Sequence, residues 1–501
     1  MALKLILDYS EKMVKLVTNV KKHILAGASM EYQGSKMRTI KCLLKSLFAV
    51  IIVQVCALGI SFAAGPAGKL NTNVKEFTLK NGMMFLVVER HTTPQVACRL
   101  AIRAGSALEE AGKTGIAHLL EHMMFKGTKN FGTLDAEKDQ ELQAKIERAY
   151  QMIKAEQQKR RPDRRLIREK LEEMNELRSQ VQEIYVPQAF SMQLQKNGAV
   201  GVNAFTSNDQ TQFTASVPSD MIEQWFSIIS EQVFEPSWRE FYVEKEVVQR
   251  EWAFRYVNNP EGAAWLDLNA TAYTAHPYRN PVIGWKSDME MYSTADAIAF
   301  HKKYYTPSNT VCVLVGDITV DKARNFAETY FERYPAGGSA PESVTREPEQ
   351  VGLRKSLRYL KGARKPIVMI GFHGAKMGTR DFYALDAINM ILSTGHSARM
   401  KQDIEEMGLA QEAWSWNPDN RYGGIFVLGG SPNEPEEEKA AGLSDGEMSE
   451  LYLKACEELK NILVSQLEKL KEEFVPVAEL RRIKKLSQSD FLRSLKSNEK
   501  F

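Results

Sequence analysis

Two histidines and a glutamate fall within one short stretch, His118-Leu119-Leu120-Glu121-His122. On an α-helix, residues four apart share a face, so both imidazoles can reach a single metal ion. Glu121 lies on the same face, close enough to take a proton from a water held by that metal. In a chain with eight histidines, chance would place this pattern about once in 100 sequences. The stretch therefore predicts a metal-assisted hydrolytic centre, the alternative being two helix histidines that pack or face solvent.

The residue order reverses the His-Glu-x-x-His arrangement of many zinc peptidases. Two imidazoles leave zinc in need of a third protein ligand, and a catalytic zinc keeps its fourth position for water. A helix expected over 241–257 offers Glu244, Glu246 and Glu251. Glu244 and Glu251 lie about two helical turns apart and so share a face. Spacing alone leaves the choice among the three glutamates open.

The elements expected around these residues form two groups separated by a linker. Residues 336–349, rich in Gly, Ser, Pro and Glu, predict the linker. From 350 to 501 a strand followed by a helix repeats the order seen at 96–125, which favours an internal duplication. We expect strands within 74–103, 199–217, 310–318 and 423–430, and helices over 114–125, 219–233, 241–257, 320–334 and 446–473.

Residues 134–185 differ from the rest of the chain in composition. They are dense in Glu, Lys, Arg and Gln, and their few apolar residues recur three or four apart on either side of Arg161-Pro162-Asp163. This pattern predicts two antiparallel helices that form a projecting hairpin. We interpret the hairpin as a solvated insertion without chemistry. The alternative is a module that binds a partner or a membrane surface, although mixed charges and the lack of an aromatic face argue against membrane insertion.

Residues 1–64 carry the features of an export signal. Three basic residues between 38 and 45 precede an apolar run from Leu47 to Phe62, which ends in the small residues Ala63 and Ala64. We expect translation to start at Met37, cleavage near these alanines and export to a bacterial periplasm. An uncleaved membrane anchor is the alternative, since the run is near the lower length limit for a bilayer span.

Composition excludes several classes of protein. A chain of 501 residues is long enough for two or three domains. Its hydrophobic share of 44% and charged share of 26% are typical of soluble globular proteins and exclude gross disorder. The net charge of +3 is nearly neutral for this length, and basic residues are not interleaved with aromatic ones. We therefore expect no nucleic-acid partner.

Five sequence blocks together resemble the family of pitrilysin, insulin-degrading enzyme and the mitochondrial processing peptidase. In order they read HLLEHMMFKGT, NAFTSNDQTQFTASVP, EKEVVQRE, HPYRNPVIG and YYTPSNTVCVLVGDI. The resemblance covers about residues 74 to 500 and is strongest to the bacterial single-half branch. It implies an α+β chain of two homologous halves, each a mainly antiparallel sheet flanked by helices. The half at 72–335, which holds the hairpin insertion, would be catalytic. The half at 350–501 would bind no metal and apparently ends early.

The resemblance also implies roles for the site residues. His118, His122 and Glu251 would bind one zinc ion, and Glu121 would activate the water. Glu244 would support the site from behind the ligands. The gap of 129 residues between His122 and Glu251 is long for the family, and the excess is about the size of the hairpin.

The resemblance also makes predictions about substrate binding, through Asn203 and through the second half of the chain. Asn203 falls in the family's N-A-F-T strand and would contact substrate, the alternative being a turn-forming strand residue. Family members often have an Arg and a Tyr in the second half that bind substrate and stabilise the oxyanion. Here Ile404 or Glu405 stands in place of the Arg and Gln411 in place of the Tyr. We therefore expect a homologous subunit, in a homo- or hetero-oligomer, to supply that pair.

Taken together, the residues and the resemblance predict a zinc-dependent endopeptidase for peptides or unfolded polypeptides. The substrate would bind extended, as an added strand near 199–217. The alternative is a non-catalytic or substrate-presenting subunit of a peptidase-like complex. If the signal is cleaved, we expect no stable membrane insertion.

Overall fold

The structure is a computed structural model that describes residues 73–341, 343–360, 363, 365–436 and 442–501. The expected export signal lies outside these residues. Within them, no helix combines the length and the apolar character needed to cross a bilayer.

A six-stranded sheet organises the first half, in the order β1-β2-β6-β3-β5-β4. All neighbouring pairs are antiparallel except β2 and β6, which are parallel. The expected α+β class with a mainly antiparallel sheet is confirmed. The strands are β1 (Lys75–Thr78), β2 (Met84–Glu89), β3 (Gln95–Ile102), β4 (Val200–Thr206), β5 (Thr211–Pro218) and β6 (Thr310–Gly316).

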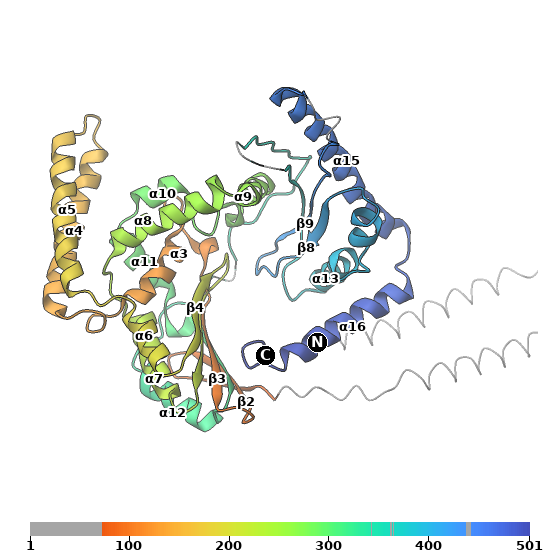
Figure 1. The fold of residues 1–501 in the computed structure, drawn as a ribbon. Coiled ribbons are helices and arrows are strands. Elements are labelled where there is room, and N and C mark those ends of the chain that lie inside the picture. Colours follow the sequence, from red (N-terminus) through yellow and green to blue (C-terminus); the bar gives the residue numbers. More distant parts are fainter. Residues whose placement is uncertain (1–72, 342, 361–362, 364, 437–441) are drawn as a thin grey trace, which may run out of the picture. The chain divides into compact units, whose positions relative to one another are not determined.

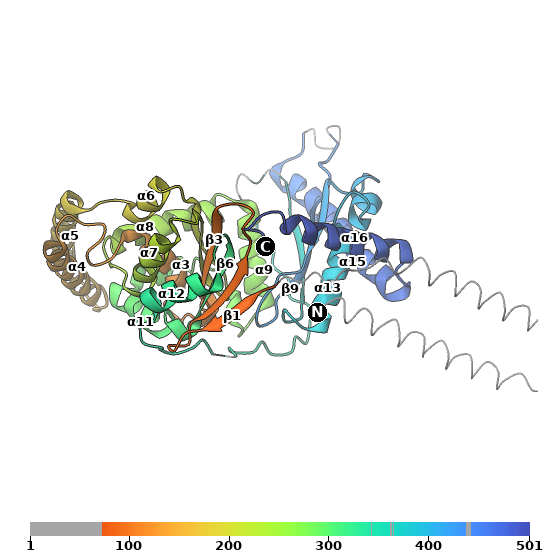
Figure 2. The same ribbon diagram turned by 90° about the horizontal axis from the view of Figure 1, so that it is seen from below.

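Helices α3, α7 and α12 pack against this sheet around one apolar core (Figures 1 and 2). The helices expected near 114–125, 219–233, 241–257 and 320–334 are present, whereas α6, α9, α10 and α11 were not expected. The helices outside the hairpin are α3 (Ile116–Met123), α6 (Ala189–Lys196), α7 (Ile222–Phe234), α8 (Phe241–Trp252), α9 (Pro260–Ala272), α10 (Lys286–Met291), α11 (Thr294–Tyr304) and α12 (Val320–Phe331).

The charged segment forms the expected helical hairpin, which projects from the first half (Figure 1). It consists of α4 (Ala136–Gln157) and α5 (Arg164–Ile184). The carboxylates of Asp135 and Asp163 accept hydrogen bonds from the first backbone N–H groups of α4 and α5, respectively. The two helices meet along a buried apolar seam that includes Leu142, Ile146, Ile153, Met174, Leu177 and Val181.

The second half contains a three-stranded antiparallel sheet in the order β7-β9-β8 and has its own apolar core. The described residues between α12 and β7, which include the expected linker at 336–349, form neither helix nor strand. The elements are β7 (Val368–His373), α13 (Arg380–Ser393), β8 (Glu412–Trp416), β9 (Ile425–Ser431), α15 (Asp445–Glu472) and α16 (Val477–Ser494).

Candidate metal centre

Helix α3 begins at a position that requires glycine. Gly115 has a φ of 92°, and a Cβ there would lie 2.2 Å from the carbonyl oxygen of Ile283. The Glu109 carboxylate accepts hydrogen bonds from the N–H groups of Gly115 and Ala117 at 2.9 and 2.8 Å, which satisfies the first turn of the helix. Burial raises the pKa of Glu109 to about 8. This tight start fixes the direction in which α3 presents its side chains.

The two imidazoles of α3 meet a carboxylate from α8. The Glu251 Oε2 atom lies 3.8 Å from His118 Nε2 and 3.6 Å from His122 Nε2. Ligand atoms from all three residues lie within 4.8 Å of one another, the only such group of three among the described residues. Nitrogen and oxygen ligands about 2.0–2.2 Å from a tetrahedral zinc are separated by about 3.5 Å. The two carboxylate–imidazole distances therefore fit zinc with adjustments of a few tenths of an ångström, and the two imidazole nitrogens, which lie no more than 4.8 Å apart, would move closer together around the ion.

Different contacts set the protonation state and the orientation of the two imidazoles. His118 is 6% exposed, and burial, followed by the charges of His122 and Arg255, lowers its pKa to about 3. Its ring is therefore neutral, as a metal ligand must be. The Nδ1 atom of His118 is buried and has no hydrogen-bond partner among the described residues, so packing alone orients this ring.

His122 is oriented by a carboxylate behind it. Its Nδ1 atom lies 3.1 Å from Glu244 Oε2, which leaves Nε2 free to face the metal position. Burial by itself lowers the pKa of His122, but the hydrogen bond and charge of Glu244 raise it above its usual value. Glu244 also pairs with Lys126 Nζ at 2.5 Å. This carboxylate–imidazole pair is the arrangement that typically fixes a zinc-binding histidine.

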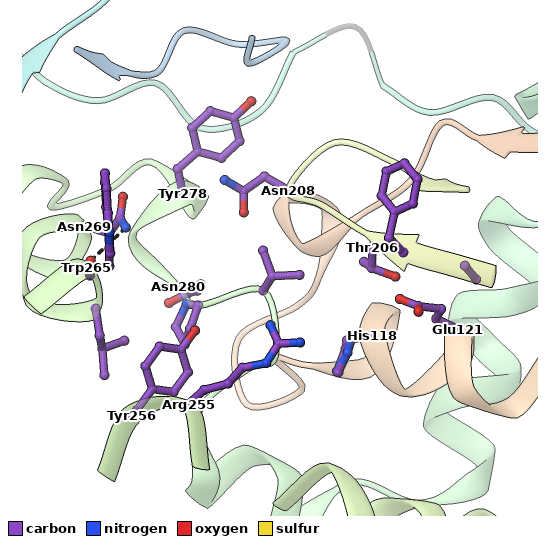
Figure 3. A pocket seen from close by; sticks show the side chains of 15 residues that line it. His118, Glu121, Thr206, Asn208, Arg255, Tyr256, Trp265, Asn269, Tyr278 and Asn280 are labelled. Atoms are coloured by element: carbon purple, nitrogen blue, oxygen red, sulfur yellow. Dashed lines mark hydrogen bonds between the residues drawn. The ribbon is translucent and has the colours of Figure 1, made fainter. Parts of the chain in front are cut away.

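The carboxyl group of Glu121 lies beside the three candidate ligand atoms but does not belong to that group of three. Burial raises the pKa of its carboxyl group, and a hydrogen bond from the Thr206 hydroxyl partly opposes the rise. Both Glu121 and Thr206 line the same cavity, from α3 and β4 respectively (Figure 3). The carboxyl group is therefore placed to accept a proton from a molecule bound between it and the metal position.

Arg255 neutralises the outer face of the third ligand. Its Nη2 atom lies 2.5 Å from Glu251 Oε1, so the other carboxylate oxygen, Oε2, remains directed toward the imidazoles. Arg255 belongs to η3 (Ala253–Val257), a π-helical turn that continues α8. Such turns occur frequently at functional sites because they change which side chains face a given direction.

A cavity of about 420 Å³ opens onto these residues. Figure 3 shows the side chains of His118 and Glu121 on one side and those of Arg255 and Tyr256 on another. The walls combine aromatic rings with amide groups, which suits a polypeptide with its own hydrogen-bonding groups. The remaining lining residues are Ala204, Phe205, Thr206, Asn208, Trp265, Leu266, Asn269, Tyr278, Asn280, Pro281 and Val282.

The structure brings most of the expected site residues together. His118, His122, Glu251 and Glu121 share one site, with Glu244 directly behind His122. Asn203 lies apart from them: it is exposed on β4, opposite Thr214, and its neighbours in the strand line the cavity instead.

Four contributing residues were not expected from the sequence: Glu109, Lys126, Thr206 and Arg255. Of these, only Arg255 had a local signal, because it follows Glu251 by one helical turn. In the second half, Ile404 is buried in the apolar core, and Glu405 accepts a hydrogen bond from Ala413 N.

Two models of one peptidase family match the chain. The family model described as "Insulinase (Peptidase family M16)" matches residues 84–159 and 182–286. The model "Peptidase M16 inactive domain" matches residues 292–487. The chain is 26% identical over 462 residues to "Zinc protease PqqE" of Helicobacter pylori, covering 91% of this chain and 86% of that protein. It is 24% identical over 412 residues to "Uncharacterized zinc protease YmxG" of Bacillus subtilis, covering 79% of this chain and 85% of the relative.

Solved structures share the fold. A crystal structure of a protease from Helicobacter pylori aligns with a TM-score of 0.66 at 24% identity, covering 85% of this chain and 87% of that one. The first half of the periplasmic protease PqqL from Escherichia coli aligns with a TM-score of 0.55 at 18% identity, covering 85% and 79%. Both family models match in order, and the relatives are named zinc proteases. The chain therefore belongs to peptidase family M16, consistent with its single-half branch.

Proposed function

We propose that the chain is a zinc-dependent endopeptidase that hydrolyses peptides or unfolded polypeptides. One observation carries the proposal: two imidazole nitrogens and a carboxylate oxygen converge, with a separate carboxyl group beside them, at the wall of a cavity. The names of the relatives support zinc as the metal, and the single group of three ligand residues found among the described residues supports one ion per chain.

Each residue of the site would have a distinct task. His118, His122 and Glu251 would hold the ion, which when bound would lower the pKa of a coordinated water and polarise the scissile carbonyl. Glu121 would take the proton from the attacking water and pass it to the leaving amine. Glu244 would keep the His122 ring in its binding orientation.

The substrate would lie along β4. This strand is at the end of the sheet order, so one of its edges has no strand partner among the described residues. An extended peptide can add to such an edge through main-chain hydrogen bonds, which demands little of its sequence. The exposed Phe205 of β4 lines the cavity and would contact a substrate side chain, whereas Asn203 would contact the bound backbone from the strand itself.

The test is the Glu121→Gln variant, with metal analysis and digestion of a peptide library. We expect it to retain zinc and its thermal stability but to lose hydrolysis by about 100-fold or more, because the proton acceptor is gone. Turnover at the wild-type rate with one zinc bound would contradict the proposal. The exposed Glu246→Gln on α8 is the matched control and should hydrolyse normally.

A second candidate is a substrate-presenting or non-catalytic subunit. The second half favours it, because the positions expected for the Arg and Tyr pair hold Ile404, Glu405 and Gln411, and the first two have structural contacts. We further propose that a homologous subunit supplies that pair and that the protein acts in the periplasm, where the similar protease PqqL of Escherichia coli is located. Zinc-loaded protein that cleaves no peptide, alone or with a co-purified homologue, would favour the second candidate.

A further inference from the structure

The far end of the hairpin gathers basic side chains. Residues 159–168, here called the basic tip, hold six basic residues and one acidic residue. Lys159 pairs with Glu156, whereas the tip's arginines are all exposed and, in the part of the chain that the structure describes, their side chains have neither a hydrogen bond nor an ion pair. These arginines are Arg160, Arg161, Arg164, Arg165 and Arg168.

The rest of the hairpin has the opposite charge. Residues 136–157 and 169–184 together hold ten acidic and six basic residues. Because α4 has 22 residues, the positive tip stands about 33 Å from its base. Charge is therefore separated along the hairpin, so an anionic surface attracts the tip and repels the two shafts.

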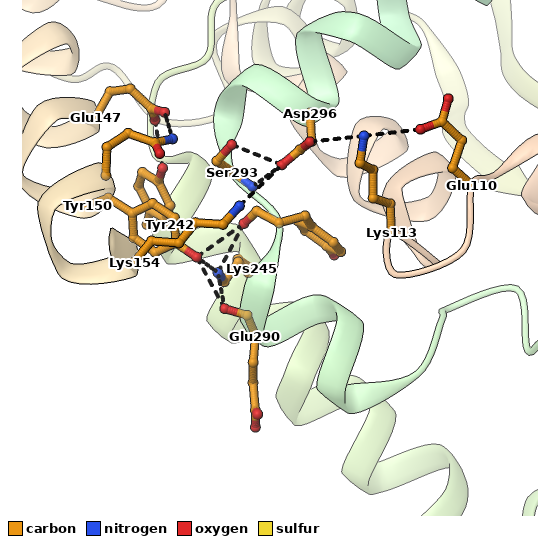
Figure 4. Close-up of polar contacts among 12 residues, drawn as sticks. Glu110, Lys113, Glu147, Tyr150, Lys154, Tyr242, Lys245, Glu290, Ser293 and Asp296 are labelled. Carbon is orange, nitrogen blue, oxygen red and sulfur yellow. Dashed lines mark hydrogen bonds and ion pairs between the residues drawn. The ribbon is translucent and has the colours of Figure 1, made fainter. Parts of the chain in front are cut away.

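Contacts along α4 fix the hairpin to the first half, and Figure 4 shows those made by Tyr150 and Lys154. Lys245 Nζ of α8 donates to Tyr150 Oη at 2.8 Å and to the carbonyl oxygens of Glu290 and Tyr292 at 3.0 and 3.2 Å. Lys154 lies 3.8 Å from Asp296. A buried ion pair of 2.7 Å joins Arg239 to Asp139 at the start of α4. These contacts hold the hairpin as a rigid arm, so the tip points in a set direction relative to the metal centre.

The tip's arginines also lie outside the family match. The match to the M16 model stops at residue 159 and resumes at 182. The unpaired arginines therefore lie outside the segments that match the family model, and the metal centre does not account for them.

We propose that the basic tip docks the protein on an anionic phospholipid membrane. A guanidinium group binds a phosphate through two parallel hydrogen bonds, and each basic residue near an anionic bilayer strengthens binding about fivefold. The same chain carries the apolar run Leu47–Phe62 behind basic residues, a segment expected to meet a membrane during export. Contact would be electrostatic and superficial, because Leu166 and Ile167, the only apolar residues of the tip apart from Pro162, are half-buried.

Other polyanions fit the tip less well. It has no aromatic side chain to stack on unpaired bases, which single-strand binders commonly use. It also lacks the Trp and Tyr anchors that, with Arg, are enriched among interface hot spots, and its ten residues are fewer than the roughly 20–30 per side of a stable protein interface. A membrane surface requires neither.

The test compares two variants of the full chain that lose equal charge. Arg160→Gln/Arg161→Gln/Arg165→Gln alters the tip, and Lys138→Gln/Lys145→Gln/Arg148→Gln alters the shaft. Their co-sedimentation would be measured with vesicles of phosphatidylglycerol and phosphatidylcholine, and with phosphatidylcholine alone. We expect the tip variant to bind the anionic vesicles about 100-fold more weakly, the shaft variant to bind like wild type, and salt to weaken wild-type binding.

Equal loss in both variants, or binding unaffected by either, would overturn the proposal. So would tighter binding at the same salt to a single-stranded oligonucleotide, or to soluble short-chain phosphatidylglycerol below its micelle concentration. Hydrolysis of a soluble peptide should be the same in wild type and both variants, so docking and peptidase activity can fail independently. Unchanged melting temperatures would show that each variant is folded.

Discussion

Helix α3 in the first half and helix α13 in the second each follow a sheet strand, but their polar side chains have different partners. On α3, His118 and His122 direct Nε2 atoms toward Glu251 without a hydrogen bond between them. On α13, the polar groups are satisfied by each other and by β8: Ser415 Oγ lies 2.7 Å from Ser393 Oγ and donates to Asn389 Oδ1 at 2.8 Å.

The difference fits the proposal that the first half holds a metal and the second does not. Buried polar atoms need partners. In the first half the three candidate ligand atoms have no hydrogen bond to another described residue, so an ion could bind them without displacing a protein partner. In the second half the hydroxyl and amide groups already have them, so an ion would have to break hydrogen bonds to enter. The model described as an inactive domain matches residues 292–487, which include this α13–β8 cluster but not His118, His122 or Glu251.

The largest expected effect comes from removing a ligand. His118→Ala leaves two of three protein ligands, so we expect the zinc content to fall from one per chain toward zero and hydrolysis to fall at least 1000-fold, as is typical when a catalytic centre is lost. Elemental analysis after dialysis against a weak chelator measures the zinc content. The matched Asn389→Ala change on α13 should leave zinc unaffected; a loss of zinc in that variant would break the contrast between the halves.

The second-largest effect is expected from Glu244, whose carboxylate lies behind His122. Glu244→Gln keeps a hydrogen-bonding group but loses the charge that orients the imidazole and pairs with Lys126. We expect zinc affinity to fall about 10- to 100-fold. Competition with a fluorescent zinc chelator would measure this. Equal affinities for Glu244→Gln and the exposed Glu246→Gln would show that Glu244 does not support the site.

In contrast to His118 and His122, the buried His301 has a structural role. His301 is buried, its Nε2 atom lies 2.8 Å from the Val233 carbonyl oxygen, and burial lowers its pKa from 6.5 to about 4. Between these values the unfolded chain binds more protons, so stability falls as the pH drops through this range. We expect a loss of about 2 kcal/mol from this group between pH 7 and 5.

The His301→Gln variant keeps the hydrogen bond but cannot titrate. Its unfolding free energy should therefore depend less steeply on pH from 7 to 5 than that of the wild type, while its zinc content stays the same. Urea unfolding at several pH values tests this, and parallel curves for the two proteins would contradict it.

The smallest effect is expected in the second half. Ser415→Ala removes one hydroxyl from the α13–β8 cluster, so we expect a stability loss of about 1 kcal/mol and no change in zinc or hydrolysis. Thermal unfolding with and without a chelator measures the stability loss and the contribution of bound metal to stability. A chelator-dependent shift that differs from the wild type would mean that the halves are energetically coupled through the metal.

Sequence reasoning reached the metal centre because the helix period alone places His118, Glu121 and His122 on one face. It could not choose Glu251 over Glu244 and Glu246 from spacing, since the choice depends on how α8 packs against α3. Thr206 and Lys126 were missed because tertiary packing brings their partners from distant elements. Among the strands, the position of β6 was not predicted, because strand patterns show burial but not the neighbour chosen across 200 residues of chain.

That position of β6 has a consequence for folding. The strand at 310–316 inserts between β2 and β3, pairing in parallel with one and antiparallel with the other. The central sheet therefore cannot close until more than 200 residues after β3 have been made available, and the two earlier strands keep open edges until then. Closing such long loops is slow. We expect assembly of this half to be a late, cooperative event.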